Sequence, residues 1–442
     1  MVTEKEIVSL VDQYIKDKHS KKSWKAGEDW VQYAGPYFDS AEYIVAVKTL
    51  LSEWLVLGAE ATKFERKFPK KLGKNFGLLT NSGSSANLLM MLAMTSKRYA
   101  NLPKGTKVIT PIAGFPTTIN PILQVGFKPI FVDIELDTLN LDLDQVEQAC
   151  IENPDVKIIT FAHVLGNPPN MKRLMEIVEK YKLVLLEDCC DALGSTYEGK
   201  PLGSFGKMAS CSFYPAHHIT MGEGGFVAVD DPILERVIRS FREWGRGCFC
   251  IGKQNLLENG ACGCRFNNWV PSIPDELFDH KYVYEEIGYN LKPIELQASI
   301  GLVQMEKLEE IGIKRRNNYK NLYNVFSKYN EYFHLHEAQL GADVDWFAFP
   351  ITIKDGAPFK RSDICKFFES NKIQTRPYFA GNIMLQPAYA GLMDPKEVIE
   401  KYPIARKVTT DTFFLGTSPV IDKEKIDYIE VVLNKFIDGK TK

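Results

Sequence analysis

Residues 157–188, with the sequence KIITFAHVLGNPPNMKRLMEIVEKYKLVLLED, predict the core of the fold. The apolar runs KIITFAH (157–163) and KLVLLED (182–188) are typical of buried strands, and NMKRLMEIVEKY (170–181) between them has the apolar spacing of a helix. This alternation indicates a mostly parallel sheet with helices on both faces. Ligands of such sheets bind beyond the carboxyl ends of the strands, where Asp188 and the two cysteines that follow it are expected to lie.

The same alternation extends along most of the first half of the chain. KVITPI (107–112) and PIFVDI (129–134) are two further predicted strands. Residues 243–285 interrupt the alternation of strands and helices, because they are rich in Gly, Asn, Cys and Pro and have few periodic apolar positions. A loop of this length inside a compact domain is usually functional or disordered.

A division into three parts follows from these patterns. We expect an N-terminal helical segment at 1–58 that packs on the small domain, a large doubly wound α/β domain at 59–310, and a small α+β domain at 311–442. Residues 41–56 and 423–437 are predicted helices, a long helical region begins at IELQ (294–297), and WFAFPITIK (346–354) contains a predicted strand.

Composition excludes several functional classes. The chain has 442 residues, of which 45% are hydrophobic and 25% charged, as in globular proteins with a large core. Its 54 Lys and Arg nearly balance its 56 Asp and Glu, so no electrostatic reason exists to expect nucleic acid or an anionic membrane as a partner. No apolar run reaches the ~18 residues of a membrane span, and the first residues are too charged for a secretory signal. We expect a cytoplasmic protein.

Several segments have the residues of a cofactor pocket, each with a plainer explanation. LLTNSGSSANLLMML (78–92) places a Ser/Gly turn before a helix, which favours a bound phosphate or is an ordinary helix cap. Asp188 is placed to face a pyridinium nitrogen, or it ends a strand as a turn residue. Phe115 either stacks on a cofactor ring or belongs to the core, and Ser212 either binds phosphate or satisfies a backbone group.

Taken in order, these segments resemble one family, the fold-type I pyridoxal phosphate enzymes that act on nucleotide-linked keto-sugars, the sugar aminotransferase family. The resemblance covers nearly the whole chain, in NSGSSAN, PIAGFPTTINPI, FVDIELDTLNLD, HVLGNPPNM, LLEDCCDALGSTYEGKPLGSFG, SFYPAHHITMGEGG, GYNLKPIELQASIGL and TRPYF. It implies a seven-stranded type of large sheet and a homodimer with shared active sites. It also implies cofactor roles for Asp188 at the pyridine nitrogen, for Phe115 on the ring, for Gly83, Ser84 and Ser212 at the phosphate, and for Asn290 at the partner subunit's phosphate.

The family lysine, which binds the cofactor aldehyde, corresponds to His217 in FYPAH. An imidazole cannot form that Schiff base, so the resemblance implies a non-covalently held cofactor, best as pyridoxamine 5'-phosphate (PMP). With an unperturbed pKa near ~6.5, His217 is suited to take a proton from the cofactor's C4-prime carbon while a 4-keto sugar loses its 3-hydroxyl. We expect the neighbouring His218 to be an ordinary core or surface residue.

This chemistry is that of a small branch of the family, the keto-sugar 3-dehydratases. Two further departures from the aminotransferases agree with the branch: Asp191 replaces a usual Gln, and Phe347 replaces a frequent His. We assign Asp191 and Tyr214 to the catalytic set together with His217.

Nine cysteines in a cytosolic chain are not expected to form disulfides. Cys190, Cys248, Cys250 and Cys262 resemble the [2Fe–2S] ligands of the CDP-4-dehydro-6-deoxyglucose 3-dehydratases, although the spacing between the third and fourth is longer here, and Cys264 competes with Cys262 as fourth ligand. The alternative is a structural zinc held by the cysteines of 248–264, with Cys190 merely buried. Cys150, Cys211 and Cys365 are expected to be small buried residues.

Together these expectations describe a PMP-dependent, [2Fe–2S]-containing 3-dehydratase of a nucleotide-linked 4-keto-6-deoxyhexose, first of all CDP-4-dehydro-6-deoxy-D-glucose, in 3,6-dideoxysugar and lipopolysaccharide synthesis. A flavin or iron–sulfur reductase fed by NAD(P)H would supply electrons. The alternatives are a cluster-free GDP-4-keto-6-deoxymannose 3-dehydratase that takes its amine from glutamate, a dTDP-sugar 3-dehydratase, or a non-catalytic zinc-bearing relative that binds nucleotide-sugar.

Overall fold

A seven-stranded sheet forms the centre of the large domain. The computed structural model describes residues 2–21, 23–248 and 265–440. Along the sheet the strands are β1 (Phe76–Thr80), β9 (Gly225–Val229), β8 (Met208–Ser212), β5 (Val184–Asp188), β4 (Ile158–Ala162), β2 (Lys107–Pro111) and β3 (Lys128–Val132). All pairings from β8 to β3 are parallel, and β9 runs antiparallel to both of its neighbours. The predicted mostly parallel, doubly wound sheet is therefore confirmed.

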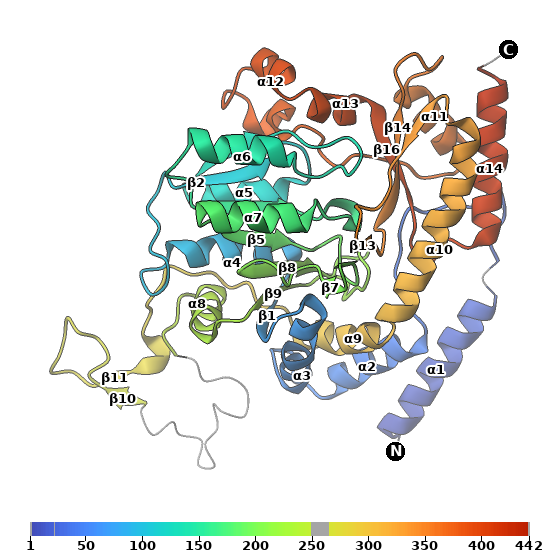
Figure 1. Ribbon diagram of the computed structural model, residues 1–442. Coiled ribbons are helices and arrows are strands. Elements are labelled where there is room, and N and C mark those ends of the chain that lie inside the picture. The colour runs from blue at the N-terminus through green and yellow to red at the C-terminus, as the bar shows by residue number, and fades with distance from the viewer. Residues whose placement is uncertain (1, 22, 249–264, 441–442) are drawn as a thin grey trace.

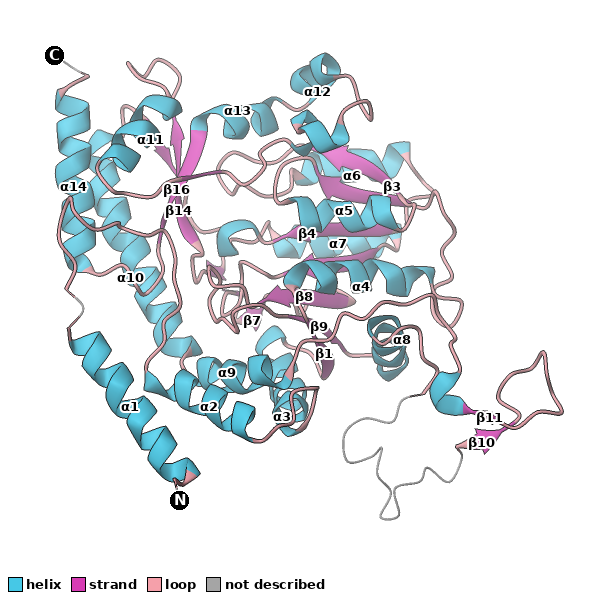
Figure 2. Ribbon diagram, turned by 180° about the vertical axis from the view of Figure 1, so that it is seen from behind, coloured by secondary structure: helices cyan, strands magenta, loops and turns pink. Residues whose placement is uncertain are grey.

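Helices cover both faces of this sheet (Figures 1 and 2). Neighbouring strand residues point to opposite faces: Ile159 and Leu185 join one core cluster, whereas Ile158 and Leu186 join another. The first cluster also includes residues of α3 (Ala59–Lys67), α6 (Leu143–Glu152), α7 (Met171–Tyr181) and α9 (Glu295–Glu306). The second includes residues of α4 (Gly83–Thr95), α5 (Pro116–Gln124) and α8 (Pro232–Arg242). Because both faces are buried, the central strands are apolar without alternation.

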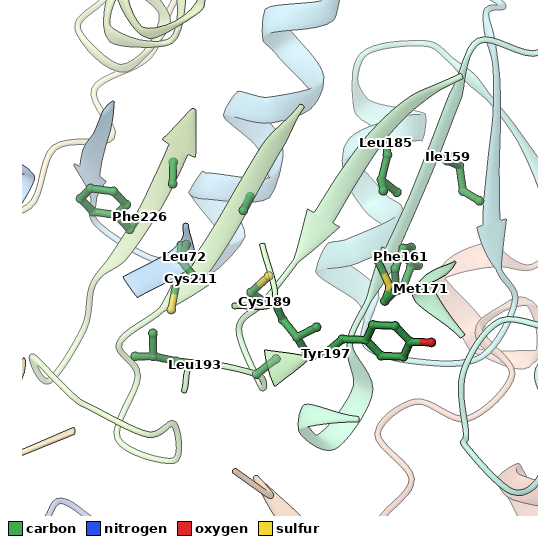
Figure 3. Packing of buried hydrophobic residues seen from close by; sticks show 14 of the residues in the cluster. Leu72, Ile159, Phe161, Met171, Leu185, Cys189, Leu193, Tyr197, Cys211 and Phe226 are labelled. Atoms are coloured by element: carbon green, nitrogen blue, oxygen red, sulfur yellow. The ribbon is translucent and has the colours of Figure 1, made fainter. Parts of the chain in front are cut away.

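Three cysteines, Cys150, Cys189 and Cys211, belong to this core. Figure 3 shows Cys189 and Cys211 packed among buried apolar side chains such as Leu72, Leu193 and Phe226. Burial raises the pKa of both thiols, so they are small apolar residues of the core. The expectation that Cys211 and Cys150 are buried is confirmed, but Cys365 is only partly buried, because it lies at the edge of the small domain's core.

The small domain is a four-stranded antiparallel sheet with helices. The strand order is β12 (Phe333–Leu335), β14 (Ala348–Ile353), β16 (Thr412–Gly416) and β15 (Arg376–Pro377). One face packs on α10 (Leu308–Phe326), α11 (Arg361–Ser370) and α14 (Lys423–Asp438). The other face, with α12 (Pro395–Lys401) and α13 (Pro403–Asp411), packs against the large domain. This second contact brings small-domain residues to the carboxyl ends of the large sheet.

The N-terminal segment contains α1 (Glu4–Ser20) and α2 (Ser40–Leu51). Between them the chain touches the small domain, with Val31 in a bridge to Ile373, whereas α2 packs on α9. The segment thus contacts both domains. The three-part division of the chain stays a prediction.

Short strands complete the structure. A small sheet joins β6 (Thr196–Tyr197), β7 (Lys200–Pro201) and β13 (Ala342–Asp343), and the hairpin of β10 (Phe266–Asn267) and β11 (Phe278–Asp279) projects from the body (Figure 1). Within the described residues, no helix has both the length and the apolar character needed to cross a membrane.

Candidate active site

A cavity of about 560 Å³ opens at the carboxyl ends of the large sheet, where the small domain meets it. Its size is typical of a small-molecule site. Its lining comes from the large domain, the small domain and the N-terminal segment: Tyr33, Ser82, Gly83, Ser84, Phe115, Thr117, Thr118, Ala162, Asp188, Cys190, Asp191, Ser212, Tyr214, Ala216, His217, Glu223, Phe347, Arg376, Pro377, Phe379 and Phe414. No described residue in this lining is a lysine.

Asp188 ends β5 on the floor of the cavity and is held there by several donors. Its carboxylate accepts hydrogen bonds from Asn87 Nδ2 at 2.7 Å and Thr118 Oγ1 at 2.7 Å. The Cys190 backbone N–H also donates to it, at 3.1 Å, and Ser210 Oγ lies at 3.4 Å. A buried carboxylate with so many fixed partners presents a negative charge in one orientation, as a pyridinium nitrogen requires.

The start of α4 forms a polar cradle beside this floor. Ser82 caps the helix, because its hydroxyl accepts from the Ser85 N–H at 3.1 Å, and Gly83 and Ser84 follow in the first turn. A Cβ at Gly83 would lie 2.5 Å from Ser212 Cβ and 3.0 Å from Cys190 Sγ. The glycine therefore keeps open a space bordered by a helix N-terminus and a serine hydroxyl, which suits a phosphate.

His217 and Asp191 face each other across the cavity wall. Nδ1 of His217 lies 3.4 Å from Asp191 Oδ1 and has no hydrogen-bond partner among the described residues. Burial, reinforced by the charge of Arg315, lowers the pKa of the imidazole. Burial, reinforced by the charge of Asp188, raises the pKa of the Asp191 carboxyl. The imidazole is thus a neutral group able to accept a proton at neutral pH.

Aromatic side chains and one cation form the outer wall. The Phe347 ring lies 5.2 Å from the His217 ring, and Phe115 packs edge-on against Phe379. Phe115 and Tyr214 are about half exposed, at 50% and 47%. The guanidinium of Arg376 stacks on the Tyr33 ring at 4.3 Å. These side chains give the cavity an aromatic surface and the positive charge of Arg376.

The structure brings together most of the predicted site residues. The cavity lining contains the whole predicted catalytic set, Cys190 and five of the six predicted cofactor residues, namely Gly83, Ser84, Phe115, Asp188 and Ser212. Asn290 lies outside this lining, exposed in a bridge to Glu243, and its role at a partner subunit's phosphate stays a prediction. Cys248 is described but does not line the cavity, and Cys250 and Cys262 lie outside the described residues. His218 is buried, with Nε2 2.5 Å from the Asp345 carbonyl oxygen.

Sequence reasoning missed the side chains that orient Asp188. Asn87 and Thr118 stand in the motifs NSGSSAN and PIAGFPTTINPI, but their spacing gives no sign that both reach one carboxylate. Arg376 and Tyr33 were also missed, because they come from segments far apart in the chain.

The residues fit a pyridoxamine 5'-phosphate. A fixed carboxylate stands on the cavity floor, and a glycine-opened cradle with a helix N-terminus lies beside it. Asp188 would hold the pyridine nitrogen, and Gly83, Ser84 and Ser212 would hold the phosphate.

Comparison with known sequences and structures agrees with this fit. The sequence model of the DegT/DnrJ/EryC1/StrS aminotransferase family matches residues 38–434. The lipopolysaccharide biosynthesis protein RfbH of Salmonella typhimurium is 41% identical over 98% of this chain and 97% of its own length. The dTDP-4-dehydro-2,6-dideoxy-D-glucose 3-dehydratase of Saccharopolyspora spinosa is 38% identical over 98% of this chain and 91% of its own length.

Among solved structures, a GDP-4-keto-6-deoxymannose 3-dehydratase with a trapped PLP–glutamate geminal diamine superposes with a TM-score of 0.76. It is 28% identical and covers 91% of this chain and 99% of its own. The expected fold, a fold-type I pyridoxal phosphate architecture, is therefore confirmed.

Proposed function

Because the chain belongs to the DegT/DnrJ/EryC1/StrS aminotransferase family, we propose that it is a PMP-dependent 3-dehydratase of a nucleotide-linked 4-keto-6-deoxyhexose. The family is one of pyridoxal phosphate enzymes of nucleotide-sugar and deoxysugar synthesis. One observation carries the finer proposal: the cavity has the His217 imidazole on its wall and no lysine in its described lining. The names of the 3-dehydratases similar to this chain support it.

The bound cofactor would supply an amine that condenses with a ketone and a ring that accepts electrons. His217 is the base. Asp191 faces Nδ1 of the imidazole, which leaves Nε2 as the atom that accepts a proton. That proton and the departing 3-hydroxyl leave together as water. Tyr214 and Phe347 border the same space, where they orient the sugar and exclude solvent.

The overall reaction replaces the C-3 hydroxyl with hydrogen and consumes two electrons. In the reductive route the electrons come from NAD(P)H through a separate reductase and a [2Fe–2S] cluster. Cys190 supports this route, because its sulfur lies beside Gly83 in the cavity, and the sequence supplies Cys248, Cys250 and Cys262 as further thiolates.

A second candidate route needs no cluster. Glutamate would supply the two electrons and leave as 2-oxoglutarate and ammonia. The likeness to a GDP-4-keto-6-deoxymannose 3-dehydratase trapped with PLP and glutamate favours this route. Named relatives likewise support dTDP- or GDP-linked substrates, whereas the CDP-linked sugar is supported only by the likeness of the cysteine set.

The test is turnover with PMP and each of the CDP-, dTDP- and GDP-linked 4-keto-6-deoxyhexoses, with either glutamate or a chemical one-electron donor. With at least one of these substrates, mass spectrometry should find a nucleotide-sugar product that has one oxygen atom fewer than the substrate. A product in which the ketone has become an amine, with its oxygen count otherwise unchanged, would identify an aminotransferase and overturn the proposal.

Iron decides between the two routes. Anaerobically purified protein should absorb broadly between roughly 400 and 600 nm and bleach with dithionite if a cluster is present. Cys190→Ser should then lose both the iron and the turnover that depends on the electron donor. Cys365 is a partly buried thiol of the small domain, and Cys365→Ser should keep both properties. Iron-free protein that turns over with glutamate would establish the second route.

The homodimer that Asn290 implies is proposed with the same function. Its exposed position outside the described cavity lining fits a role in a second copy's site. Sedimentation of the purified protein tests it.

A further inference from the structure

Arg315, on α10, carries a buried positive charge for which the described residues provide no paired carboxylate. Its side chain is among the largest fully buried ones of the molecule. Among the described residues Arg315 forms no ion pair, although its neighbour Arg316 pairs with Asp345. Asp345 and Asp191 act on this charge without forming an ion pair with it. Burying a cation without a directly paired carboxylate is costly, so such a residue is expected where its hydrogen bonds do something that a neutral side chain cannot.

The guanidinium connects two separate segments, one with each terminal nitrogen. Nη2 donates to the carbonyl oxygens of Ala216 at 3.2 Å and His217 at 3.0 Å. Nη1 donates to the carbonyl oxygens of Phe347 at 2.9 Å and Trp346 at 3.4 Å. Nη1 also lies 3.4 Å from Thr417 Oγ1. A planar fork with donors at fixed angles holds both carbonyl pairs at once, which the single ammonium of a lysine does not.

The two segments are the ones whose side chains meet on the cavity wall. The first carries the imidazole of His217, and the second carries the ring of Phe347, 5.2 Å away. The second segment belongs to the small domain, at the start of β14. Arg315 therefore ties the turn that bears the proposed base to the opposite domain.

A chain of contacts closes this connection into a ring. The Phe347 N–H donates to the Leu165 carbonyl oxygen at 2.9 Å. The Leu165 N–H in turn donates to Asp191 Oδ2 at 3.2 Å, and Asp191 Oδ1 faces the His217 imidazole. Arg315 is the member of this ring that joins the His217 backbone to Phe347. Leu165 has φ of 56°, an uncommon conformation for a non-glycine residue, which this ring of contacts maintains.

We infer that Arg315 is a positioning residue, which holds the turn of His217 against the small domain so that the imidazole, Asp191 and Phe347 form one fixed wall. Arg315 does not line the cavity, so it would not contact a substrate or cofactor bound there. The kinetic part of this inference rests on the proposed dehydratase function. Misplacing a reacting group by about 1 Å costs on the order of 100-fold in rate, so loss of the guanidinium should lower kcat by about that factor.

The test compares Arg315→Lys and Arg315→Met with the wild type. We expect kcat to fall about 100-fold in Arg315→Met and at least tenfold in Arg315→Lys, with KM for the nucleotide-sugar and Kd for PMP within about threefold. Guanidinium ions should restore part of the activity of an Arg315→Gly variant. Lys314→Met, one residue away on α10 at a partly exposed lysine that pairs with Glu310, is the matched control and should behave as the wild type.

A second readout needs no turnover. The chain has seven histidines, so the imidazole signals of protein labelled in histidine are few enough to assign by single substitutions. The His217 signal, identified by its loss in His217→Asn, should shift or broaden in Arg315→Lys, while that of the exposed His19 stays in place. If the dehydratase proposal fails, this measurement still tests the position of the imidazole.

Two outcomes would overturn the inference. One is a folded Arg315→Lys variant with an unmoved His217 signal and kcat within threefold of the wild type. The other is a rise in KM or in the Kd for PMP at unchanged kcat, which would place Arg315 in ligand binding instead. If Arg315→Met does not fold, Arg315→Lys alone decides.

Discussion

His217 illustrates how much of the chemistry of this site rests on one side chain. A lysine in its place would bind the cofactor aldehyde covalently, whereas in the proposed mechanism the neutral imidazole leaves the cofactor free and acts as the base. Burial makes this possible, because it lowers the imidazole pKa and keeps the ring uncharged at neutral pH.

Replacing His217 with Asn should therefore separate binding from catalysis. We expect turnover to fall by a factor of 100 to 10,000, the range that general bases contribute, with Kd for PMP changed less than threefold. Stopped-flow kinetics and PMP titration measure the two quantities. His218→Asn, which alters a buried ring that bonds to Asp345, controls for a general disturbance of the turn. Equal losses of turnover and PMP affinity would count against His217 as the base.

Asp188 should have the opposite signature. Asp188→Asn keeps the size of the side chain but removes the charge that faces the proposed pyridinium nitrogen. We expect the Kd for PMP to rise at least tenfold, which corresponds to about 1.4 kcal/mol. Fluorescence titration with PMP measures this Kd. The control is Asp142→Asn, because Asp142 caps α6 and does not line the cavity. Unchanged PMP affinity would mean that the carboxylate serves the fold alone.

At the scale of elements, the contact between the start of α4 and the end of β8 defines the phosphate cradle. Gly83→Ala would place a Cβ 2.5 Å from Ser212 Cβ, a distance that real contacts do not reach. We expect at least a tenfold weaker affinity for PMP and a cost in stability of about 1–3 kcal/mol from overpacking. The control is Gly35→Ala, where the nearest atom to the added Cβ lies at 3.6 Å, and it should change neither the stability nor the affinity for PMP.

The double variant Gly83→Ala/Ser212→Gly isolates the cause of that loss. The second substitution removes the Ser212 Cβ that the new alanine side chain would meet. Thermal unfolding should therefore show that most of the lost stability is recovered. The affinity for PMP should stay low, because the serine hydroxyl is missing. A double variant no more stable than Gly83→Ala would place the strain elsewhere.

The elements themselves were predictable where the sequence is strongly patterned. The run 182–188 became β5 (Val184–Asp188) and 170–181 became α7 (Met171–Tyr181), because apolar spacing alone distinguishes a buried strand from an amphipathic helix. The predicted helix 41–56 ends earlier, at Leu51. β8 was not predicted, because Met208–Ser212 is a run of small residues whose strand character comes from pairing with distant segments.

The site was predictable to a different degree. Asp188 and His217 stand in motifs whose order resembles a known family, so their place in the cavity was expected. Arg315 was not, because a charged residue in a polar helix is indistinguishable in sequence from a solvent-exposed one. Only the fold shows that this position of α10 points at two carbonyl pairs from other segments.

At the scale of the molecule, His336 connects the two domains and makes stability depend on pH. Its Nε2 bonds to Thr352 Oγ1 at 2.9 Å, and Nδ1 faces the Asp137 carbonyl oxygen of the large domain at 3.4 Å. Burial, with the neighbouring His334, lowers its pKa to about 3. Below pH 6.5 the unfolded chain therefore binds a proton that the folded protein does not, and stability falls as pH decreases toward 3.

This effect amounts to about 2 kcal/mol between pH 7 and pH 5, at about 1.4 kcal/mol per pH unit below 6.5. His336→Asn should be less stable at pH 7 but should lose less stability than the wild type on acidification, as denaturant unfolding at both pH values would show. The exposed His19→Asn variant should keep the wild-type dependence. A parallel loss in wild type and His336→Asn would assign the acid sensitivity to other groups.

The walls of the cavity are drawn from nearly the whole length of the chain, from Tyr33 to Phe414. Synthesis on the ribosome proceeds from the first of these residues to the last, so Gly83 and the proposed base, His217, emerge long before β16 exists. A nascent chain thus has a cofactor half-site open to water and a bare apolar face where the small domain will later pack. The emergence of β16, rather than the assembly of the central sheet, sets the moment at which this protein first has a closed cavity.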